Sequence, residues 1–212
     1  MVEVKICGIT DEDALDAAVE AGADYVGLVF FAKSPRHIAP DLAAELVQFL
    51  DEGVAKVGLF VDPDDALLDE VLGHLRLDLL QLHGSETPER VEQIRLEYGL
   101  PVMKVIPVAS ADDLKAAEAY YGVADRLLFD AKPPKGSELP GGNAVSFDWT
   151  ILKGFTCPLP WMLAGGLTPA NVAEAIRISG AKAVDVSSGV ETAPGAKDPD
   201  KIRGFIATAK GH

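Results

Sequence analysis

The sequence predicts an α/β fold, a single (β/α)8 barrel with its active site at the C-terminal ends of the strands. Eight short apolar segments rich in β-branched residues recur along the 212 residues, and stretches with helical spacing separate most of them. The segments read as continuous apolar runs, which is typical of parallel strands covered on both faces. Eight units leave about 26 residues each, close to the smallest βαβ repeat, so residues 1–212 are expected to form one domain.

The expected strands are, in chain order, 2–7, 25–31, 55–61, 77–82, 101–107, 126–130, 161–164 and 183–186. Helical spacing follows the first strand at Ala14, Leu15, Ala18 and Val19. An open, doubly wound sheet is the competing layout. That fold usually places a glycine-rich dinucleotide turn after the first strand, whereas this chain has Cys7-Gly8-Ile9-Thr10 there. The barrel is therefore preferred.

Helix boundaries are indicated by local signals. Four helices are expected to begin after a side chain that can cap the first turn, namely Thr10, Asp62, Thr87 and Thr168. Three helices are expected to end at glycines, namely Gly22, Gly99 and Gly180. The sixth unit is the least regular, because a long loop runs from Pro133 to Gly142. Long loops in compact domains are often functional, so a partial lid is expected here.

Composition limits the possible partners. The chain has 19 Lys and Arg against 33 Asp and Glu, a formal net charge of −14. Such a charge repels nucleic acids and anionic membranes, so we expect neither as a partner and favour a small molecule. The sequence starts without a signal-peptide pattern and lacks a long apolar run, which predicts a cytoplasmic protein. Two distant cysteines and four scattered histidines give no metal-binding spacing, so no metal is expected.

In a barrel of this kind, the polar residues that close each strand are the candidates for the site. They are Cys7, Arg36, His83, Asp130, Gly165, Gly166, Asp185, Ser187 and Ser188. The same criterion excludes Cys157, which precedes the seventh strand. The loops at Gly165-Gly166 and Ser187-Ser188 offer backbone N–H groups beside helix N-termini, which is typical of a phosphate site. The alternative is that these glycines only form tight turns.

Cys7 and Asp130 end strands on roughly opposite sides of the ring. A thiolate removes a proton from carbon if positive surroundings lower its pKa from about 8.5, and a carboxylic acid kept neutral donates one. The alternatives are a buried apolar role for Cys7, and a salt bridge from Asp130 to Lys132 or Lys104. Two interpretations also remain for Arg36, which either binds a planar carboxylate through two N–H groups or lies on the surface. His83 is either a member of the site or only forms hydrogen bonds within its loop.

Together these residues resemble the phosphoribosylanthranilate isomerase family of tryptophan biosynthesis, over essentially the whole chain. The matching segments are Val4-Lys5-Ile6-Cys7-Gly8-Ile9-Thr10, Gly27-Leu28-Val29-Phe30 to Ser34-Pro35-Arg36, Leu80-Gln81-Leu82-His83-Gly84, Leu128-Phe129-Asp130, Phe147-Asp148-Trp149, Ala164-Gly165-Gly166-Leu167, and Val184 to Glu191 followed by Pro194-Gly195 and Lys197-Asp198. The joint order and spacing of these motifs is highly specific.

The resemblance implies an Amadori rearrangement of N-(5-phosphoribosyl)anthranilate to 1-(o-carboxyphenylamino)-1-deoxyribulose 5-phosphate without a cofactor. Asp130 would protonate the ring oxygen and Cys7 would remove the C2′ proton. Arg36 would hold the anthranilate carboxylate, Asp185 the amine region, and Gly165, Gly166, Ser187 and Ser188 the phosphate. His83 and Gly142 complete the implied substrate-binding set. The protein is expected as a monomer or homodimer.

One segment departs from the family pattern. After Gly141-Gly142 the family has serine or threonine and then a third glycine, whereas this chain has Asn143-Ala144. If the family's third glycine has a positive φ, alanine at this position has two possible outcomes. Either Ala144 is strained by roughly 1 kcal/mol, or the loop takes another path. Trp149 is expected to pack beneath this loop.

Two other functions stay open at this point: an isomerase for the imidazole carboxamide of histidine synthesis, and a binder of phosphorylated metabolites without activity.

Overall fold

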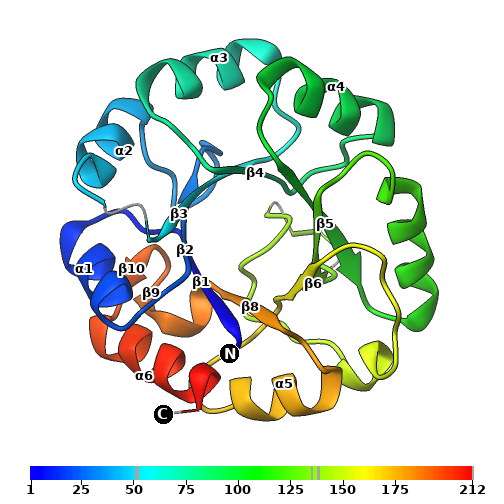
Figure 1. Ribbon diagram of the computed structural model, residues 1–212. Coiled ribbons are helices and arrows are strands. Elements are labelled where there is room, and N and C mark those ends of the chain that lie inside the picture. The colour runs from blue at the N-terminus through cyan, green and yellow to red at the C-terminus, as the bar shows by residue number, and fades with distance from the viewer. Residues whose placement is uncertain (51–52, 135, 138, 212) are drawn as a thin grey trace.

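The computed structural model describes residues 1–50, 53–134, 136–137 and 139–211 of the chain. Eight parallel strands form a closed barrel in the order of the sequence, which confirms the predicted (β/α)8 TIM barrel (Figure 1). The strands are β1 (Glu3–Cys7), β2 (Tyr25–Val29), β3 (Ala55–Phe60), β4 (Leu79–Leu82), β5 (Val102–Val108), β6 (Arg126–Ala131), β7 (Trp161–Leu163) and β8 (Ala183–Val186). Each matches an expected strand within a few residues.

Helices surround the barrel on the outside (Figure 1). The α-helices are α1 (Glu12–Glu20), α2 (Pro40–Val47), α3 (Asp65–His74), α4 (Pro88–Tyr98), α5 (Val172–Ser179) and α6 (Pro199–Lys210). Three segments are 3-10 helices, η1 (Ala111–Tyr120), η2 (Trp149–Leu152) and η3 (Ser188–Val190), and a small hairpin follows, β9 (Glu191–Ala193) and β10 (Ala196–Lys197). Helix α6 packs beside α1 and completes the outer ring. Within the described ranges, no helix is long and apolar enough to cross a membrane.

One of the four expected helix caps is confirmed, and three are wrong. Thr87 accepts from the backbone of Arg90 as predicted, but α1 is capped by Asp11, one residue after Thr10. Asp64 rather than Asp62 caps α3, because Asp62 has a positive φ of 45° and bonds to Ser85 instead. Helix α5 begins after Asn171, since a turn closed by the Asn171 side chain on the backbone of Thr168 precedes it.

The expected helix ends agree better with the structure. Gly99 and Gly180 close α4 and α5 in the left-handed conformation. Gly22 lies two residues beyond the end of α1, also with a positive φ. These positions need a residue without a Cβ, which is why glycine marks them in the sequence.

The two-residue period of the strands decides which side chains enter the barrel. Val4 and Ile6 face outward into the core beneath the helices. The alternate positions of the other strands fill the lower barrel with apolar side chains such as Leu79, Met103 and Leu128. Above them the same parity brings Lys5, Cys7, Gln81, Asp130 and Asp185 to the upper barrel, and all five are buried. The strands therefore point their polar side chains toward one mouth.

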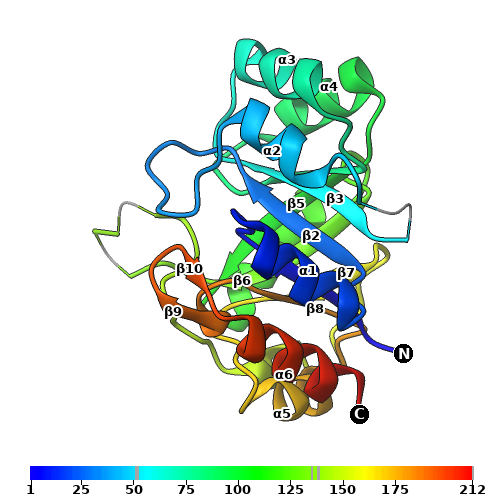
Figure 2. The same cartoon turned by 90° about the vertical axis from the view of Figure 1, so that its left-hand side faces the viewer.

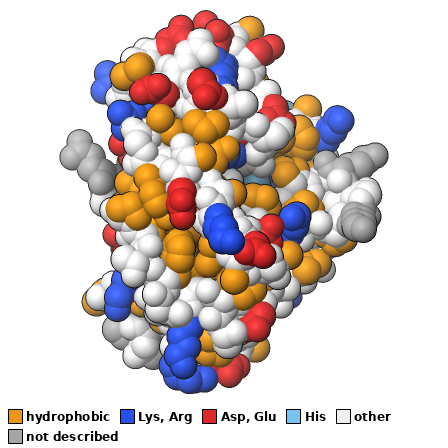
Figure 3. Space-filling model, turned by 90° about the vertical axis from the view of Figure 1, so that its right-hand side faces the viewer, with side chains coloured by type: hydrophobic (Ala, Val, Ile, Leu, Met, Phe, Trp, Pro, Cys, Tyr) orange, Lys and Arg blue, Asp and Glu red, His pale blue; other side chains and the backbone are white. Residues whose placement is uncertain are grey.

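That mouth lies opposite the chain termini. Figure 2 shows the β9–β10 hairpin and the long loops at one end of the barrel, and both termini at the other. The C-terminal ends of the strands thus carry the loops that the sequence predicts to be functional. On the side seen in Figure 3, acidic, basic and hydrophobic side chains are interspersed, and the face is hollowed close to one edge.

Candidate active site

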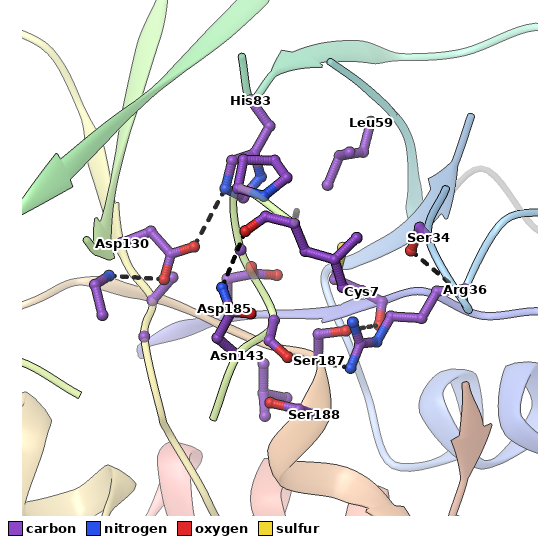
Figure 4. A pocket seen from close by; sticks show the side chains of 18 of the residues that line it. Cys7, Ser34, Arg36, Leu59, His83, Asp130, Asn143, Asp185, Ser187 and Ser188 are labelled. Carbon is purple, nitrogen blue, oxygen red and sulfur yellow. Dashed lines mark hydrogen bonds and ion pairs between the residues drawn. The ribbon is translucent and has the colours of Figure 1, made fainter. Parts of the chain in front are cut away.

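A cavity opens at the C-terminal ends of the strands. It is lined by all ten residues that the sequence predicts for the site: Cys7, Arg36, His83, Asp130, Gly142, Gly165, Gly166, Asp185, Ser187 and Ser188. Figure 4 shows the side chains of Cys7 and Asp130 reaching it from different strands. Cys157 lies outside the lining, as expected for a residue before β7.

The thiol of Cys7 lies at the end of β1 beside a buried cation. Lys5 is fully buried and its Nζ is 2.8 Å from Oδ1 of Asp185, its register partner on β8. Gly27 on β2 provides the space for both groups. A Cβ at Gly27 would lie 3.0 Å from the sulfur of Cys7 and 3.1 Å from Nζ of Lys5. The missing side chain therefore allows the ammonium group to approach the thiol.

The surroundings of Cys7 favour the neutral thiol. Burial raises its pKa above the ordinary value, and the carboxylate of Asp185 acts in the same direction. Lys5 and Lys197 lower the pKa without offsetting these effects. Burial alone would lower the pKa of Lys5, but Asp185 and Cys7 outweigh it and the pKa is raised. A lowered thiol pKa, which a base needs, is therefore not present in this arrangement.

Asp130 lies across the cavity with His83. Its Oδ1 accepts from the backbone N–H of Ala131 at 2.8 Å, and its Oδ2 lies 3.2 Å from Nε2 of His83. Neither lysine considered as a salt-bridge partner reaches it. Lys104 points outward from β5 and pairs with Glu86, and Lys132, an exposed residue just after β6, pairs with Asp113. The salt-bridge alternative for Asp130 is therefore wrong.

Arg36 is buried at the rim of the cavity, so the surface alternative is wrong as well. It forks onto Glu191, with Nε and Nη2 at 2.7 and 2.9 Å from the two carboxylate oxygens. Lys197 is 2.7 Å from the same carboxylate. Burial would raise the pKa of Glu191, yet Arg36 and Lys197 lower it below the ordinary value. Two cations thus share one anion, which leaves positive charge at this side of the mouth.

The loop after β7 has no room for side chains at its two glycines. Gly165 and Gly166 have φ values of 88° and 62°, and a Cβ on them would lie 2.7 Å from the backbone nitrogen of Ala131 at the end of β6 and 2.8 Å from that of Ser146. In the loop after β8, Lys197 donates to the backbone oxygen and hydroxyl of Ser187 at 3.1 and 3.2 Å. The glycines do form tight turns. Their backbone also lines the cavity, and the buried ammonium group lies at the neighbouring loop, which together give an environment that suits an anion.

The loop after β6 keeps the backbone that the family's third glycine would suit. Ala144 has a φ of 55°, so the chain follows this path despite the alanine. Trp149 is partly buried and packs against the core. Residues 135 and 138 of the expected lid lie outside the described residues.

We expect Ala144→Gly to leave the free energy of unfolding unchanged or to raise it. Glycine removes left-handed strain of about 1 kcal/mol, which offsets the added freedom of the unfolded chain. The control is Ala44→Gly in the middle of α2, where glycine should cost about 1 kcal/mol. Urea unfolding followed by circular dichroism measures both variants. A loss for Ala144→Gly as large as that of the control would show that Ala144 is not strained.

Four polar residues near the cavity are not among the predicted site residues. They are Lys5, Gln81, Glu191 and Lys197, and all four stand within the segments that match the family. For Lys5 and Gln81 the signal was available, because each is a lone polar residue at an inward position of an apolar strand. For Glu191 and Lys197 it was not, since they come together only through the hairpin that follows β8.

A metal site finds no support in the described part of the chain, where no three His, Cys, Asp or Glu side chains are grouped to hold an ion. Of the two carboxylates that line the cavity, Asp185 is paired with Lys5, and Asp130 lies 3.2 Å from Nε2 of His83.

Comparison with known proteins gives a consistent result. Residues 4–208 match the model of the family described as N-(5'phosphoribosyl)anthranilate (PRA) isomerase. The N-(5'-phosphoribosyl)anthranilate isomerase of Paramagnetospirillum magneticum is 77% identical over 210 residues, which cover 99% of this chain and 98% of that protein. The crystal structure of phosphoribosyl anthranilate isomerase from Thermotoga maritima is similar with a TM-score of 0.89 and 38% identity, over all of both chains. A structure of such an isomerase in complex with reduced 1-(o-carboxyphenylamino)-1-deoxyribulose 5-phosphate has a TM-score of 0.84 and 36% identity, again over both full chains.

Proposed function

Because the chain belongs to the N-(5'-phosphoribosyl)anthranilate isomerase family, and is thus an isomerase of tryptophan biosynthesis, we propose that it catalyses an Amadori rearrangement in the cavity between Cys7 and Asp130. The substrate is N-(5-phosphoribosyl)anthranilate, and the product is 1-(o-carboxyphenylamino)-1-deoxyribulose 5-phosphate. The observation that carries this proposal is one cavity lined by a thiol beside a buried ammonium group and by an inward-facing carboxyl group. We further propose one domain over residues 1–212, in a cytoplasmic monomer or homodimer.

The substrate lies across the mouth with its phosphate on the loops after β7 and β8. Backbone groups at Gly165, Gly166 and Ser188 receive the phosphate, and the ammonium group of Lys197 beneath Ser187 supplies charge. The anthranilate ring lies toward Arg36, whose Nη1 side faces Gly142. A related isomerase is known in complex with reduced 1-(o-carboxyphenylamino)-1-deoxyribulose 5-phosphate, which supports a ligand of this kind. An acidic protein thus binds an anion through a locally positive mouth.

Ring opening is the first chemical step. Asp130 gives its proton to the furanose ring oxygen, the C1′–O bond breaks toward that oxygen, and the nitrogen lone pair forms the iminium C1′=N bond. The carboxyl group of Asp130 stays oriented toward the cavity because its other oxygen accepts a hydrogen bond from the N–H of Ala131. The iminium then makes the C2′ hydrogen acidic, so the substrate's own nitrogen serves as the electron sink.

Proton removal from C2′ by Cys7 is the second step. The electrons of the C2′–H bond form C1′=C2′, and those of the C=N bond return to nitrogen, which gives an enolamine that tautomerises to the aminoketone. The thiolate needs positive surroundings, and Lys5 is placed to supply them. We propose that Asp185 turns toward the substrate amine and leaves the ammonium group of Lys5 to the thiolate. Substrate binding then favours the charge state of Cys7 that the reaction needs.

This proposal predicts opposite effects of Asp185→Asn on thiol reactivity and on catalysis. Removing a carboxylate that raises the pKa of Cys7 increases its thiolate fraction, so alkylation by iodoacetamide at pH 8 should become several-fold faster. The kcat/KM should fall, because the contact to the substrate amine is lost. Both measurements use a Cys157→Ala background, in which Cys7 is the remaining thiol. Asp112→Asn, exposed on η1, is the matched control. Slower alkylation in Asp185→Asn would contradict the pairing.

The function itself is tested by the loss of anthranilate fluorescence on adding purified protein to freshly made substrate. The expected result is enzymatic turnover to the aminoketone, identified by mass and absorbance. The imidazole carboxamide aminoaldose serves as the competing substrate. Turnover of the imidazole compound alone, or binding of the reduced product with no turnover at all, would contradict the proposal.

A further inference from the structure

Gln81 is a buried amide next to the site, and the reaction described above gives it no part. It lies in the middle of β4 between two leucines and has no exposed surface. Its side chain points into the barrel and lines the cavity. The amide nitrogen is 3.2 Å from Nδ1 of His83, while the amide oxygen is buried with no hydrogen-bond partner among the described residues. A buried amide at a strand centre is costly, so its contact with His83 calls for an explanation.

This contact determines which ring nitrogen of His83 carries a hydrogen. The amide nitrogen of Gln81 has hydrogens to donate and no lone pair to accept, so Nδ1 must accept. The hydrogen of a neutral imidazole is then on Nε2. Nε2 lies 3.2 Å from Oδ2 of Asp130, but off the direction of a hydrogen bond, so that it has no hydrogen-bond partner within the described ranges. A small rotation of the ring aligns the N–H with the carboxyl oxygen, as catalytic contacts often tighten during reaction.

We propose that Gln81 and His83 are positioning residues for the general acid Asp130, an inference that rests on the proposed function. Gln81 holds the imidazole tautomer whose Nε2–H faces Asp130. When Asp130 transfers its proton to the ring oxygen, its O–H bond breaks and the electron pair stays on the carboxylate. The Nε2–H then donates to that carboxylate and stabilises it. His83 therefore acts on Asp130 and not on the substrate.

A glycine covers this pair from the side of the loop. A Cβ at Gly141 would lie 2.6 Å from Nε2 of His83 and 2.7 Å from Oδ2 of Asp130. The φ of Gly141 is not positive, so its backbone does not require glycine. The absence of a side chain is instead what lets the loop lie against both polar groups. By covering them it limits the access of water, which strengthens a hydrogen bond between them.

Kinetics of Gln81→Met test the positioning role. Methionine keeps the length and approximate volume but cannot donate to Nδ1. We expect kcat to fall by about tenfold or more with little change in KM, because substrate contacts remain while the acid is weakened. The matched control is Met103→Leu, the register partner of Gln81 on β5, which is buried in the barrel and should retain its kcat. A kcat for Gln81→Met within twofold of the control would overturn the proposal.

Nitrogen-15 NMR of the imidazole reads the tautomer directly, without turnover. The His83 signals are assigned by their loss in His83→Gln. We expect a hydrogen on Nε2 and none on Nδ1 in the wild type, and a hydrogen on Nδ1 in Gln81→Glu, whose carboxylate can only accept. An active wild type with its hydrogen on Nδ1 would overturn this inference alone. Wild-type protein with the expected tautomer but no turnover would overturn the proposed function and, with it, the role of the acid.

Gly141→Ala tests the pair by a route that leaves Gln81 intact. The added methyl group pushes the ring of His83 away from Asp130, so kcat should again fall by about tenfold or more while the circular dichroism stays that of the wild type. Gly122→Ala is the control, because a Cβ there meets nothing within 4 Å. An unchanged kcat in Gly141→Ala would overturn the proposal, since the contact between the two side chains would then be irrelevant to the rate.

Discussion

Cys7→Ala is expected to lower kcat by about 10²–10⁴-fold, the range that a general base contributes. The loss follows because Cys7 is the proposed base at C2′, with the ammonium group of Lys5 close to its sulfur, and the mechanism names no second base there. The fold should persist, since alanine removes one buried sulfur atom at the rim of the apolar layer formed with Val29 and Leu59. Fluorescence turnover and far-ultraviolet circular dichroism measure the two properties.

The control for Cys7→Ala is Cys157→Ala, the other cysteine of the chain, which lies outside the cavity. It should keep wild-type turnover. Cys7→Ser adds a graded comparison, because a hydroxyl is a far weaker acid than a thiol and forms little alkoxide near neutral pH. Turnover in Cys7→Ala within tenfold of the wild type, in well-folded protein, would show that another group removes the C2′ proton.

Asp130→Asn is expected to lower kcat by a similar factor of about 10²–10⁴, since the amide has the shape of the acid but no proton to give to the ring oxygen. The amide oxygen can still accept from the N–H of Ala131, so the side chain should keep its direction. We therefore expect binding of the reduced product, measured by calorimetry, to stay close to that of the wild type while turnover is lost.

Asp112→Asn, exposed at the start of η1, is the control for Asp130→Asn. It should turn over normally. A stronger test comes from Asp130→Glu, which retains the acid but moves it by one methylene and should recover part of the rate if proton donation is the role. A rate for Asp130→Asn close to that of Asp130→Glu would mean that position 130 contributes shape and not a proton.

The fold was predictable because a closed barrel repeats the same unit eight times, a buried apolar strand followed by a connection to the next strand. Apolar runs such as β4 and β6 indicated buried parallel strands, and Asp130 was expected at the mouth because it comes at the end of one of them. The caps were less predictable. Asp62 and Thr168 have suitable side chains, but Asp62 bonds to the distant Ser85, and Thr168 lies in a local turn closed by Asn171. The sequence alone carries no sign of that competition.

The residues that line the cavity were predictable from the sequence, but the pairing of their charges was less so. All ten expected residues line the cavity because strand ends and loop glycines locate the mouth. Which charges pair there depends on side chains from distant segments. Arg36 with Glu191 joins residues 155 positions apart, and Lys5 with Asp185 joins residues 180 apart. The raised pKa of Cys7 follows from that second pairing together with burial, so it could not be read from the residues alone.

The most direct test of the two-proton mechanism is turnover in deuterium oxide, followed by mass and NMR analysis of the product. The mechanism predicts one deuterium at C1′, because the enolamine is protonated there after the C2′ hydrogen has left on Cys7. Product incubated in the same solvent without substrate measures any later exchange. Product formed at the full rate with no deuterium at C1′ would contradict the mechanism, since the hydrogen would then have passed directly from C2′ to C1′.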